Sequence, residues 1–273
     1  MNRSLQNSSQ DLFFEILRKL IGENKFEYKF LYANLVEIFN GNKAVESFVI
    51  NEINNEKWIL VIHTNDLLIY GENWNSEQIK EISDAIPFNN FRNFHFSGTK
   101  KLIEDLLIYN EIQEFEIFKN RYFYRCNNLN SFDSKIVYLQ RATNEDIPEL
   151  ALMLKNYYSE EYNGKNEKKI IEMTEKISEY IENDSIYVLK KDEIIIAFQT
   201  INKIDIGILF TKEEYRNQGY GKFLLGTITE NMLNNNSIVY LMTDSTKISS
   251  NKIVCKLGYE KYYDYSDLII NGR

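Results

Sequence analysis

The 273-residue sequence is poor in cysteine, histidine and proline, with two residues of each type. Cys126 and Cys255 are far apart and neither belongs to a CxxC pair, which excludes a disulfide framework and a cysteine-rich metal site. We interpret both as small core residues. His63 and His95 have no partners at metal-ligand spacing, so we interpret them as structural or surface residues and expect no bound metal.

Long hydrophobic runs are missing as well. One of the longest apolar stretches, WILVIH at residues 58–63, is far shorter than the roughly 20 residues that a membrane span needs. The polar start MNRSLQNSSQ lacks the apolar core of a signal peptide. We therefore expect a cytoplasmic protein that has no membrane partner.

Basic residues are the minority charge, with 32 against 40 acidic ones and a formal net charge of −8. Phosphate backbones are bound by basic faces, so nucleic acid is not expected as a partner. The acidic balance weakly favours cationic ligands. A hydrophobic content of 44% is enough to fill the core of one large domain or of two ordinary ones.

Helical and strand-like patterns alternate in the first half of the chain. Apolar residues at helical spacing predict helices at residues 11–21 and 24–39. Residues 47–71 hold three apolar runs separated by Asn and Glu clusters, which predicts a meander of antiparallel strands. Further elements are predicted at 76–86 (helix), 91–96 (strand), 100–110 (helix) and 116–125 (strand). The first half is therefore expected to be an α/β unit.

The polar stretch CNNLNSFDSK, residues 126–135, is the best candidate for a linker. A strand is predicted at 135–142, and a helix follows whose start is marked by Asp146 and Glu149 at capping-box spacing around a proline. A second helix is predicted at 167–181, before three strand-like runs within 185–211. We therefore divide the chain into two domains, 1–133 and 134–273.

The sequence RNQGYG, residues 216–221, directly follows the third of these strands. Leu225, Ile228 and Met232 then form a helical stripe, and residues 238–243 form a continuous apolar run typical of a buried strand. This order predicts a strand, a glycine turn, a helix and a second strand that is parallel to the first. The helix would begin at the carboxyl end of the sheet.

Two interpretations of the glycine turn are open. The first is a flexible turn, since the turn lacks the third glycine of a dinucleotide fingerprint and the GK[ST] of a phosphate loop. The second is an anion site. The backbone N–H groups from Gln218 to Lys222 would converge at the positive end of a helix, and Gly219 and Gly221 would let phosphate oxygens approach closely. A pyrophosphate fits such a site.

The RxxGxG arrangement after the strand GILFT resembles the acyl-CoA pyrophosphate loop of the GNAT superfamily of N-acetyltransferases. LQRATNEDIPEL resembles the first strand and helix of that fold, and SSNKIVCKLGYEKY resembles its closing helix and next strand. The likeness extends over about residues 136–273. The whole chain also resembles a subgroup in which a degenerate GNAT-like domain without the motif comes first, and in which an SNK triplet, here residues 250–252, precedes the final Gly-Tyr.

The resemblance implies a mixed-sheet α/β fold, with a GNAT-like C-terminal domain behind a smaller, degenerate GNAT-like domain that has a scaffolding or substrate-cleft role. It implies transfer of an acetyl group from acetyl-CoA to a small-molecule or peptidyl amine. Backbone N–H groups of Leu209, Phe210 and Thr211 would bind the pantetheine arm and polarise the thioester carbonyl. The remaining cofactor-binding residues would be Arg216, Asn217, Gln218, Gly219, Tyr220, Gly221, Lys222 and Asn251.

Two positions depart from the family pattern. Lys247 and Val254 stand where an asparagine and a proton-donating tyrosine are common in the closing helix. Tyr259 is a candidate replacement acid and Asp205 a candidate base, although packing and a solvated strand end are alternative interpretations. Arg216 either contacts phosphate or caps the preceding turn. The missing tyrosine keeps a second function open, a catalytically silent acyl-CoA-binding sensor or interaction module.

The acceptor site is expected around residues 157–169, between the first two helices of the second domain. Tyrosine and glutamate side chains there would suit a cationic amine, and a mobile polar loop is the alternative interpretation. A flavin or nucleotide protein is a further alternative to the acyl-CoA assignment.

Overall fold

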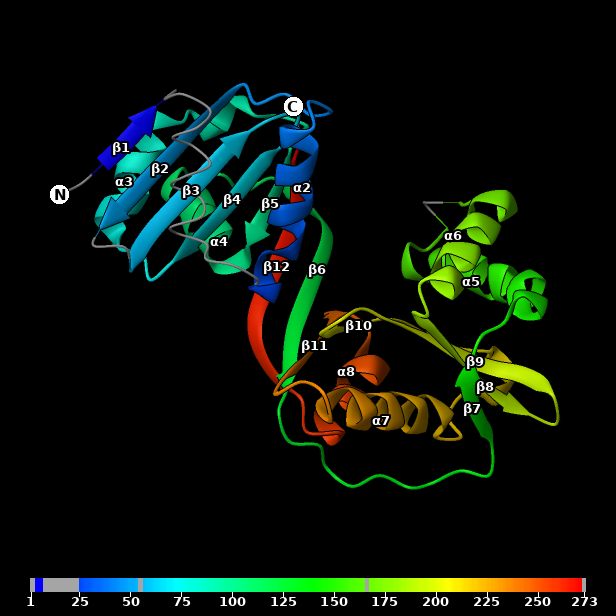
Figure 1. Ribbon diagram of the computed structural model, residues 1–273. Coiled ribbons are helices and arrows are strands. Elements are labelled where there is room, and N and C mark those ends of the chain that lie inside the picture. Colours follow the sequence, from blue (N-terminus) through cyan, green and yellow to red (C-terminus); the bar gives the residue numbers. More distant parts are fainter. Residues whose placement is uncertain (1–2, 7–24, 54–55, 165–166, 272–273) are drawn as a thin grey trace. The chain divides into compact units, whose positions relative to one another are not determined.

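A computed structural model describes residues 3–6, 25–53, 56–164 and 167–271 of the chain (Figure 1). The chain forms two compact units, and each is continuous in space but not in sequence. The first unit comprises Met1–Phe123, Asp244–Thr246 and Tyr262–Arg273, and the second comprises Tyr124–Thr243 and Lys247–Lys261. The boundary expected after residue 133 lies inside the second unit. The helix expected at 11–21 lies outside the described residues.

The first unit is built mainly from residues before 124. Its elements are β1 (Arg3–Gln6), η1 (Phe26–Tyr28), α2 (Lys29–Phe39), β2 (Ser47–Ile53), β3 (Lys57–His63), β4 (Leu67–Glu72), α3 (Ser76–Ala85), η2 (Phe88–Asn90), β5 (His95–Thr99), α4 (Lys100–Tyr109) and β6 (Phe115–Cys126). The predicted meander is confirmed, because β2, β3 and β4 pair antiparallel. The strand expected at 91–96 begins only at His95, after Asn93 takes a left-handed conformation at φ 63°.

The sheet of the first unit has the order β1-β2-β3-β4-β5-β12-β6. β4 and β5 are parallel and α3 connects them. β12 (Glu260–Ile270), the last strand of the chain, pairs antiparallel with β5 from Tyr265 opposite Thr99 onward. Leu268 and Ile270 of β12 are buried in the same core as Ile69 and Phe96. The end of the chain therefore completes the core of the unit that the start of the chain builds.

The second unit has the strand order β7-β8-β9-β10-β11, with β10 parallel to β11 and the other neighbours antiparallel. Its elements are β7 (Tyr138–Arg141), η3 (Asn144–Asp146), α5 (Ile147–Glu161), α6 (Ile170–Glu182), β8 (Ile186–Lys191), β9 (Ile194–Ile201), β10 (Asp205–Thr211), η4 (Glu213–Tyr215), α7 (Tyr220–Leu233), β11 (Val239–Asp244) and α8 (Ile248–Lys256). The predicted strand, glycine turn, helix and parallel strand are thus confirmed.

The two units repeat one order of elements. β2-β3-β4-α3-β5-α4-β6 in the first half of the chain corresponds to β8-β9-β10-α7-β11-α8-β12 in the second half. In each series the third and fourth strands form the parallel pair, with a helix between them. This repeat is visible in the structure although the sequence of the first half lacks the glycine motif.

The start of α5 is capped one turn earlier than the sequence analysis expected. Thr143 and Asp146 form the capping box, with the Thr143 N–H donating to Asp146 Oδ2 at 2.9 Å. Asp146 also pairs with Lys190 of β8 at 2.7 Å. Burial alone would raise the pKa of Asp146, but the hydrogen bonds from Lys190 and Thr143 hold it below the usual value. Glu149, the other expected capping residue, pairs with Lys212 instead.

The segment between β6 and β7, expected to be a linker, packs along the second unit. The Asn130 N–H donates to the Leu257 carbonyl at 3.0 Å. The Phe132 ring lies against Gly226 of α7, where an added Cβ would be 2.8 Å from the ring. These contacts bring Lys135 to the N-terminus of α7, where an added Cβ on Gly219 would lie 3.2 Å from its Cε.

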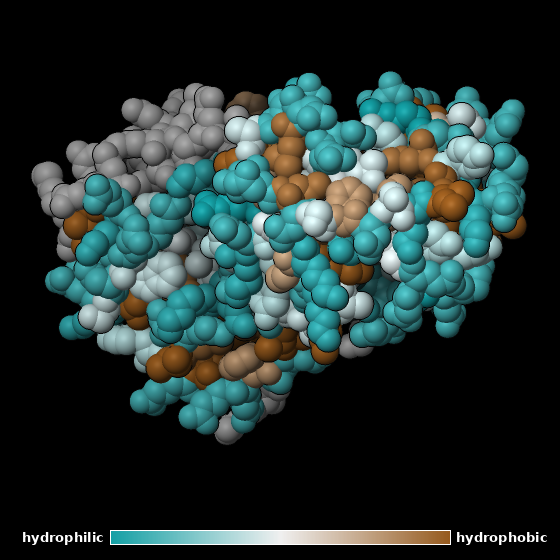
Figure 2. Space-filling model, turned by 90° about the horizontal axis from the view of Figure 1, so that it is seen from below, coloured by the Kyte–Doolittle hydropathy of each residue, from teal (hydrophilic) through white to brown (hydrophobic). Residues whose placement is uncertain are grey.

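Polar and charged side chains cover most of the face shown in Figure 2, with apolar side chains in scattered groups. Scattered exposed apolar residues are normal on folded proteins. Of the two cysteines, Cys126 is buried as expected, but Cys255 is exposed, so its interpretation as a core residue was wrong. Cys255 lies on α8, whose buried side is formed by Val254.

Candidate functional site

The carboxyl half of β10 is shaped by a bulge. β10 pairs with β11 through Asp205 and Ile206, and its register against β9 shifts between Ile206 and Leu209. The Ile208 N–H donates to Thr200 Oγ1 at 2.8 Å, and an added Cβ on Gly207 would lie 2.3 Å from the same oxygen. Glycine at this position and the hydroxyl on β9 therefore fix the bulge. The parallel pairing with β11 involves Asp205 and Ile206, at the start of β10.

The loop after β10 ends in an uncapped helix. Asn217 and Gly219 are both left-handed, at φ 60° and 84°. Gly219 is the N-cap of α7, no side chain caps it, and the first turn has no acidic residue. The first helical hydrogen bond runs from the Phe223 N–H to the Gly219 carbonyl at 3.0 Å. The N–H groups of Tyr220, Gly221 and Lys222 therefore lack a carbonyl partner within the helix.

The corresponding helix of the first unit is closed. Asn75 Oδ1 accepts from the Gln78 N–H at 2.9 Å, and Gln78 Oε1 accepts from the Asn75 N–H at 3.2 Å, which completes a capping box at the start of α3. The Gly71 N–H at the end of β4 donates to Thr99 Oγ1 at 3.3 Å, which ties β4 to β5. The N-terminus of α7 is therefore free of a capping side chain, whereas that of α3 is closed by its own side chains.

The two glycines of the loop have different neighbours. An added Cβ on Gly219 would meet the Lys135 side chain, while one on Gly221 would lie 3.4 Å from Thr211 Oγ1. Lys135 Nζ is 5.9 Å from the centre of the Tyr220 ring. The structure thus places Thr211, the two glycines and Tyr220 close to one another, with Lys135 beside them. Lys135 was not among the predicted residues, because nothing in a polar linker sequence indicates which of its residues will reach the loop.

Arg216 makes contacts in two directions. Its Nε donates to the Thr211 carbonyl at 2.8 Å, and its Nη2 pairs with Glu160 Oε1 of α5, also at 2.8 Å. The guanidinium lies 5.3 Å from the centre of the Phe210 ring. Lys247, at the N-terminus of α8, donates to the Glu160 backbone carbonyl at 3.1 Å. Arg216 therefore does bond back to the preceding strand, and its outer nitrogen faces α5.

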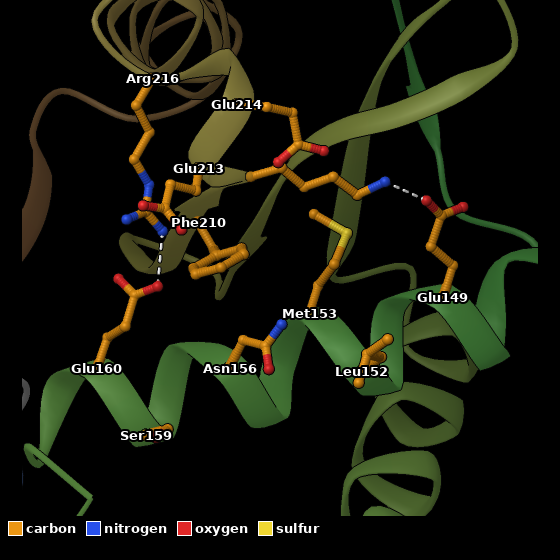
Figure 3. Close-up of a pocket in the computed structure, with 11 residues that line it drawn as sticks. Glu149, Leu152, Met153, Asn156, Ser159, Glu160, Phe210, Glu213, Glu214 and Arg216 are labelled. Carbon is orange, nitrogen blue, oxygen red and sulfur yellow. Dashed lines mark hydrogen bonds and ion pairs between the residues drawn. The ribbon is translucent and has the colours of Figure 1, made fainter.

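A pocket of about 460 Å³ lies between α5 and the segment from Phe210 to Arg216 (Figure 3). Its lining residues are Glu149, Leu152, Met153, Asn156, Ser159, Glu160, Phe210, Lys212, Glu213, Glu214 and Arg216. Two ion pairs cross it, Lys212 with Glu149 and Arg216 with Glu160. Apolar side chains of α5 and β10 share the lining with four carboxylates and two cations, so the pocket has an acidic excess.

Two predicted catalytic residues lie in confined positions. Tyr259 is 4% exposed, and its hydroxyl forms a 2.7 Å hydrogen bond with Thr229 Oγ1 of α7. Burial raises the pKa of Tyr259 well above its usual value. Asp205 is buried at the start of β10 and accepts from Asn202 Nδ2 at 3.1 Å. Thr211 is six positions further along the chain, a distance of about 20 Å along the strand.

Asn251 and Val254 both lie on α8. Asn251 Oδ1 accepts hydrogen bonds from the Tyr124 hydroxyl at 3.1 Å and from Thr243 Oγ1, so this predicted cofactor ligand connects α8 to β6 and β11. Val254 is 3% exposed and packs in the core. The roles of Asn251, Tyr259 and Asp205 in binding or catalysis stay predictions.

No group of three His, Cys, Asp or Glu side chains that could hold a metal ion occurs among the described residues. No helix in the described part of the chain has the length and apolar character that crossing a membrane requires.

Sequence comparison gives no match: no protein-family model and no curated protein matches the chain. Comparison with solved structures does give matches. An acetyltransferase of the GNAT family from Colwellia psychrerythraea superposes with a TM-score of 0.62 at 12% identity, over 99% of this chain and 100% of that one. The chain has the GNAT fold. A GCN5-related N-acetyltransferase from Sphaerobacter thermophilus gives a TM-score of 0.61 at 9% identity, over 98% and 96% of the two chains.

A Drosophila protein is also similar, with a TM-score of 0.53 at 12% identity over 98% of each chain. At these identities the likeness is one of fold, and it covers both units. The predicted fold class and the resemblance to GNAT proteins are therefore confirmed. Within the GNAT fold of this chain, the uncapped N-terminus of α7 and the bulged strand β10 lie in the second unit.

Proposed function

We propose that the chain is an acyl-CoA-dependent N-acetyltransferase that transfers an acetyl group from acetyl-CoA to an amine, and that the cofactor's diphosphate binds at the β10–α7 loop. The uncapped glycine N-terminus of α7 carries the proposal. GNAT-fold acetyltransferases are the structural neighbours. The acceptor is a small-molecule or peptidyl amine.

The residues at this loop fit a diphosphate. The N–H groups of Tyr220, Gly221 and Lys222 point along a helix dipole that favours an anion. Gly219 leaves its Cβ position open except for the flexible Lys135 side chain. Neither Lys135 nor Lys222 forms an ion pair with a described residue, and a cation at a helix N-terminus is unfavourable unless an anion is nearby.

The proposed reaction requires removal of a proton from the amine, stabilisation of the negative carbonyl oxygen and departure of the thiolate. The lone pair of a neutral amine attacks the thioester carbonyl carbon, the C–N bond forms, the C–S bond breaks, and the amine loses a proton as the thiolate leaves. Backbone N–H groups of Leu209 to Thr211, beyond the bulge, would stabilise the negative carbonyl oxygen. The remaining loop residues, Arg216, Asn217 and Gln218, would hold the diphosphate with Gly219.

The first experiment measures cofactor binding and turnover on the full chain. We expect isothermal titration to show binding of CoA, and acetyl-CoA with a panel of amines to release free thiol. Absence of CoA binding would overturn the proposal and favour a protein for another nucleotide or flavin. The dissociation constant and the rate of thiol release together separate binding from catalysis.

Tyr259 and Asp205 are proposed as acid and base, and Tyr259→Phe tests the first role. Loss of a general acid predicts a fall in kcat of about a hundredfold or more. The hydrogen bond to Thr229 predicts only a loss of about 1 kcal/mol in the free energy of unfolding. An unchanged kcat with a lower melting temperature would assign Tyr259 to packing. Asp205→Asn is measured in the same way.

A second function is favoured by Val254, which places a buried apolar side chain where a proton donor is common. It is a silent acyl-CoA-binding sensor or interaction module. A free thiol has a pKa of about 8.5, so a CoA thiolate leaves without help at a reduced rate and the enzyme function remains the first proposal. CoA binding without thiol release, for any amine in the panel, would establish the silent function instead.

The first unit is proposed to be a scaffold or part of the substrate cleft. Its α3 N-terminus is occupied by the Asn75 and Gln78 side chains, and the Thr99 hydroxyl bonds β4 to β5. These contacts support one cofactor per chain, held by the second unit.

A further inference from the structure

The C-terminal turn of α5 is fastened by two cations. The carboxylate of Glu160 pairs with Arg216 Nη2 at 2.8 Å, and the backbone carbonyl of the same residue accepts from Lys247 Nζ at 3.1 Å. Arg216 follows β10 and Lys247 follows β11. The two cations therefore reach α5 from the carboxyl ends of the two parallel strands, the edge of an α/β sheet at which ligands usually bind.

The end of α5 presents these cations with negative charge of two kinds. One is the ionised carboxylate of Glu160, which is about half exposed. The other is the C-terminus of α5 itself, which carries the negative end of the helix dipole and includes the Glu160 carbonyl. A carboxylate beside a helix C-terminus is itself unfavourable, because the two negative charges repel. Arg216 and Lys247 offset that repulsion.

Arg216 also belongs to the β10–α7 loop. Its Nε donates a hydrogen bond to the Thr211 carbonyl at 2.8 Å. This bond leaves the outer guanidinium nitrogens available to bind either a carboxylate or a phosphate. Guanidinium nitrogens bind phosphate oxygens and carboxylate oxygens with the same geometry. A diphosphate at the uncapped N-terminus of α7 would therefore compete with Glu160 for one side chain.

We propose that the C-terminal turn of α5 is an internal competitor for the cofactor's diphosphate. Glu160 holds Arg216 and Lys247 in the structure, and transfer of these cations to a diphosphate releases that end of α5. Because Glu160 and Arg216 both line the pocket between α5 and the β10–η4 segment, this release also alters the pocket. The inference rests on the proposed function, since it assigns the diphosphate to the β10–α7 loop.

Glu160→Gln tests the competition, with Glu149→Gln as the matched control. Both variants remove one negative charge from the same helix and the same pocket, but Glu149 pairs with Lys212, which lies before the loop. Titration of CoA into the full-length variants is expected to show about three- to tenfold tighter binding for Glu160→Gln, the range of a partly exposed ion pair. Glu149→Gln is expected to stay within about twofold of the wild type.

The Arg216→Ala background completes the experiment. Adding Glu160→Gln to Arg216→Ala is expected to give no gain in CoA affinity, because the cation that pairs with the Glu160 side chain is gone and Lys247 is held by the backbone carbonyl, which the substitution leaves in place. Pantetheine, which lacks the diphosphate, is expected to bind the wild type and Glu160→Gln equally.

The inference is overturned in several ways. The first is that Glu160→Gln binds CoA no more tightly than the wild type. The second is that Glu149→Gln gains as much CoA affinity as Glu160→Gln. The third is that Glu160→Gln still raises CoA affinity in the Arg216→Ala background. CoA binding to the wild type in any of these cases leaves the proposed function standing. If neither the wild type nor any variant binds CoA, both the proposed function and the competition fail.

Discussion

The two glycines of the RNQGYG motif serve different physical needs. Gly219 adopts φ 84°, a conformation that strains other residues, and it begins α7 without a capping side chain. Gly221 is helical, and an added Cβ would lie 3.4 Å from the Thr211 hydroxyl on β10, an ordinary contact distance. The sequence predicted space for phosphate oxygens at both positions. The structure adds a backbone reason at Gly219, while the protein around Gly221 would admit a Cβ.

Gly219→Val is expected to abolish measurable CoA binding while the fold is retained. The branched side chain would occupy the Cβ position beside the N–H groups of α7 and would be strained at positive φ. Gly41→Val is the matched control, because Gly41 has φ 75° and nothing within 4 Å of its Cβ position. Titration with CoA and circular dichroism measure the two variants. Unchanged affinity in Gly219→Val would contradict the diphosphate assignment.

Lys135→Ala is expected to weaken CoA binding about three- to tenfold. Its ammonium lies near the Gly219 Cβ position and forms no ion pair with a described residue, so removing it takes a charge from the proposed anion site. Lys203→Ala, an exposed lysine in the turn before β10, is the control and should bind CoA like the wild type. The loss in Lys135→Ala should shrink at high salt. Equal affinities would exclude Lys135 from the site.

Sequence patterns between neighbouring residues predicted the loop, but they did not predict contacts between residues that are far apart in the sequence. The glycines and the strand before them are neighbours in sequence, so their pattern carries the prediction. The partner of Arg216 is 56 residues away on α5, and no spacing rule links the two. Lys135 likewise depends on how a polar segment packs along α7. The core of the site was therefore predictable and its charged surroundings were not.

At the scale of elements, periodicity predicted most helices and strands, and the errors lie at their ends. The start of α5 illustrates this: Asp146 and Glu149 have capping-box spacing, but Thr143 has the extended N-cap conformation at φ −119°, and Asp146 is its partner. The sequence fits two overlapping capping boxes, Thr143 with Asp146 and Asp146 with Glu149. The backbone conformation at Thr143, which cannot be read from the sequence, determines that the first one forms. The bulge of β10 depends in the same way on a hydroxyl of the neighbouring strand.

Asp146→Asn is expected to lower the free energy of unfolding by about 1–3 kcal/mol at neutral pH, because the partly buried Lys190 loses its carboxylate partner. The folded-state pKa of Asp146 lies below its unfolded value of about 3.9. Its stabilisation is therefore present above that value and is lost as the pH falls through the lower, folded-state pKa.

Urea titrations at pH 7 and in steps below pH about 4 measure this, and the gap between wild type and variant should narrow in acid. Glu145→Gln is the control, since Glu145 is exposed beside the capping box. A gap of constant size across the acid range would show that Asp146 acts through shape and not through charge.

At the scale of the whole molecule, the order of units along the chain is the main departure from the sequence-based division. Residues 134–273 were assigned to one domain, but Tyr262–Arg273 belongs to the first unit. β12 pairs with β5, and their separation along the chain hides this pairing from any window-based pattern. The repeated order of elements was predictable from the family resemblance, whereas the pairing of β12 with β5 was not.

Leu268→Ala is expected to destabilise the first unit, although residue 268 lies near the end of the chain. Leu268 is 3% exposed in the core of that unit, and a large-to-small change in a core typically costs about 2–5 kcal/mol. Hydrogen exchange should accelerate in peptides of β5 and α4, with little change in α5 and β8. Leu154→Ala, in the core of the second unit, should give the reverse pattern. Faster exchange only in the second unit would contradict the pairing of β12.

The position of β12 has a consequence for biosynthesis. In the first unit β12 lies between β5 and β6, yet it is synthesised after every other described strand. While residues 124–261 are being synthesised, the edge of β5 therefore has no neighbour, and unpaired edges attract other chains. The first unit therefore starts to be made before the second but can complete its sheet only once β12 is made, so chains that stop before Glu260 should be more prone to aggregate than chains that contain β12.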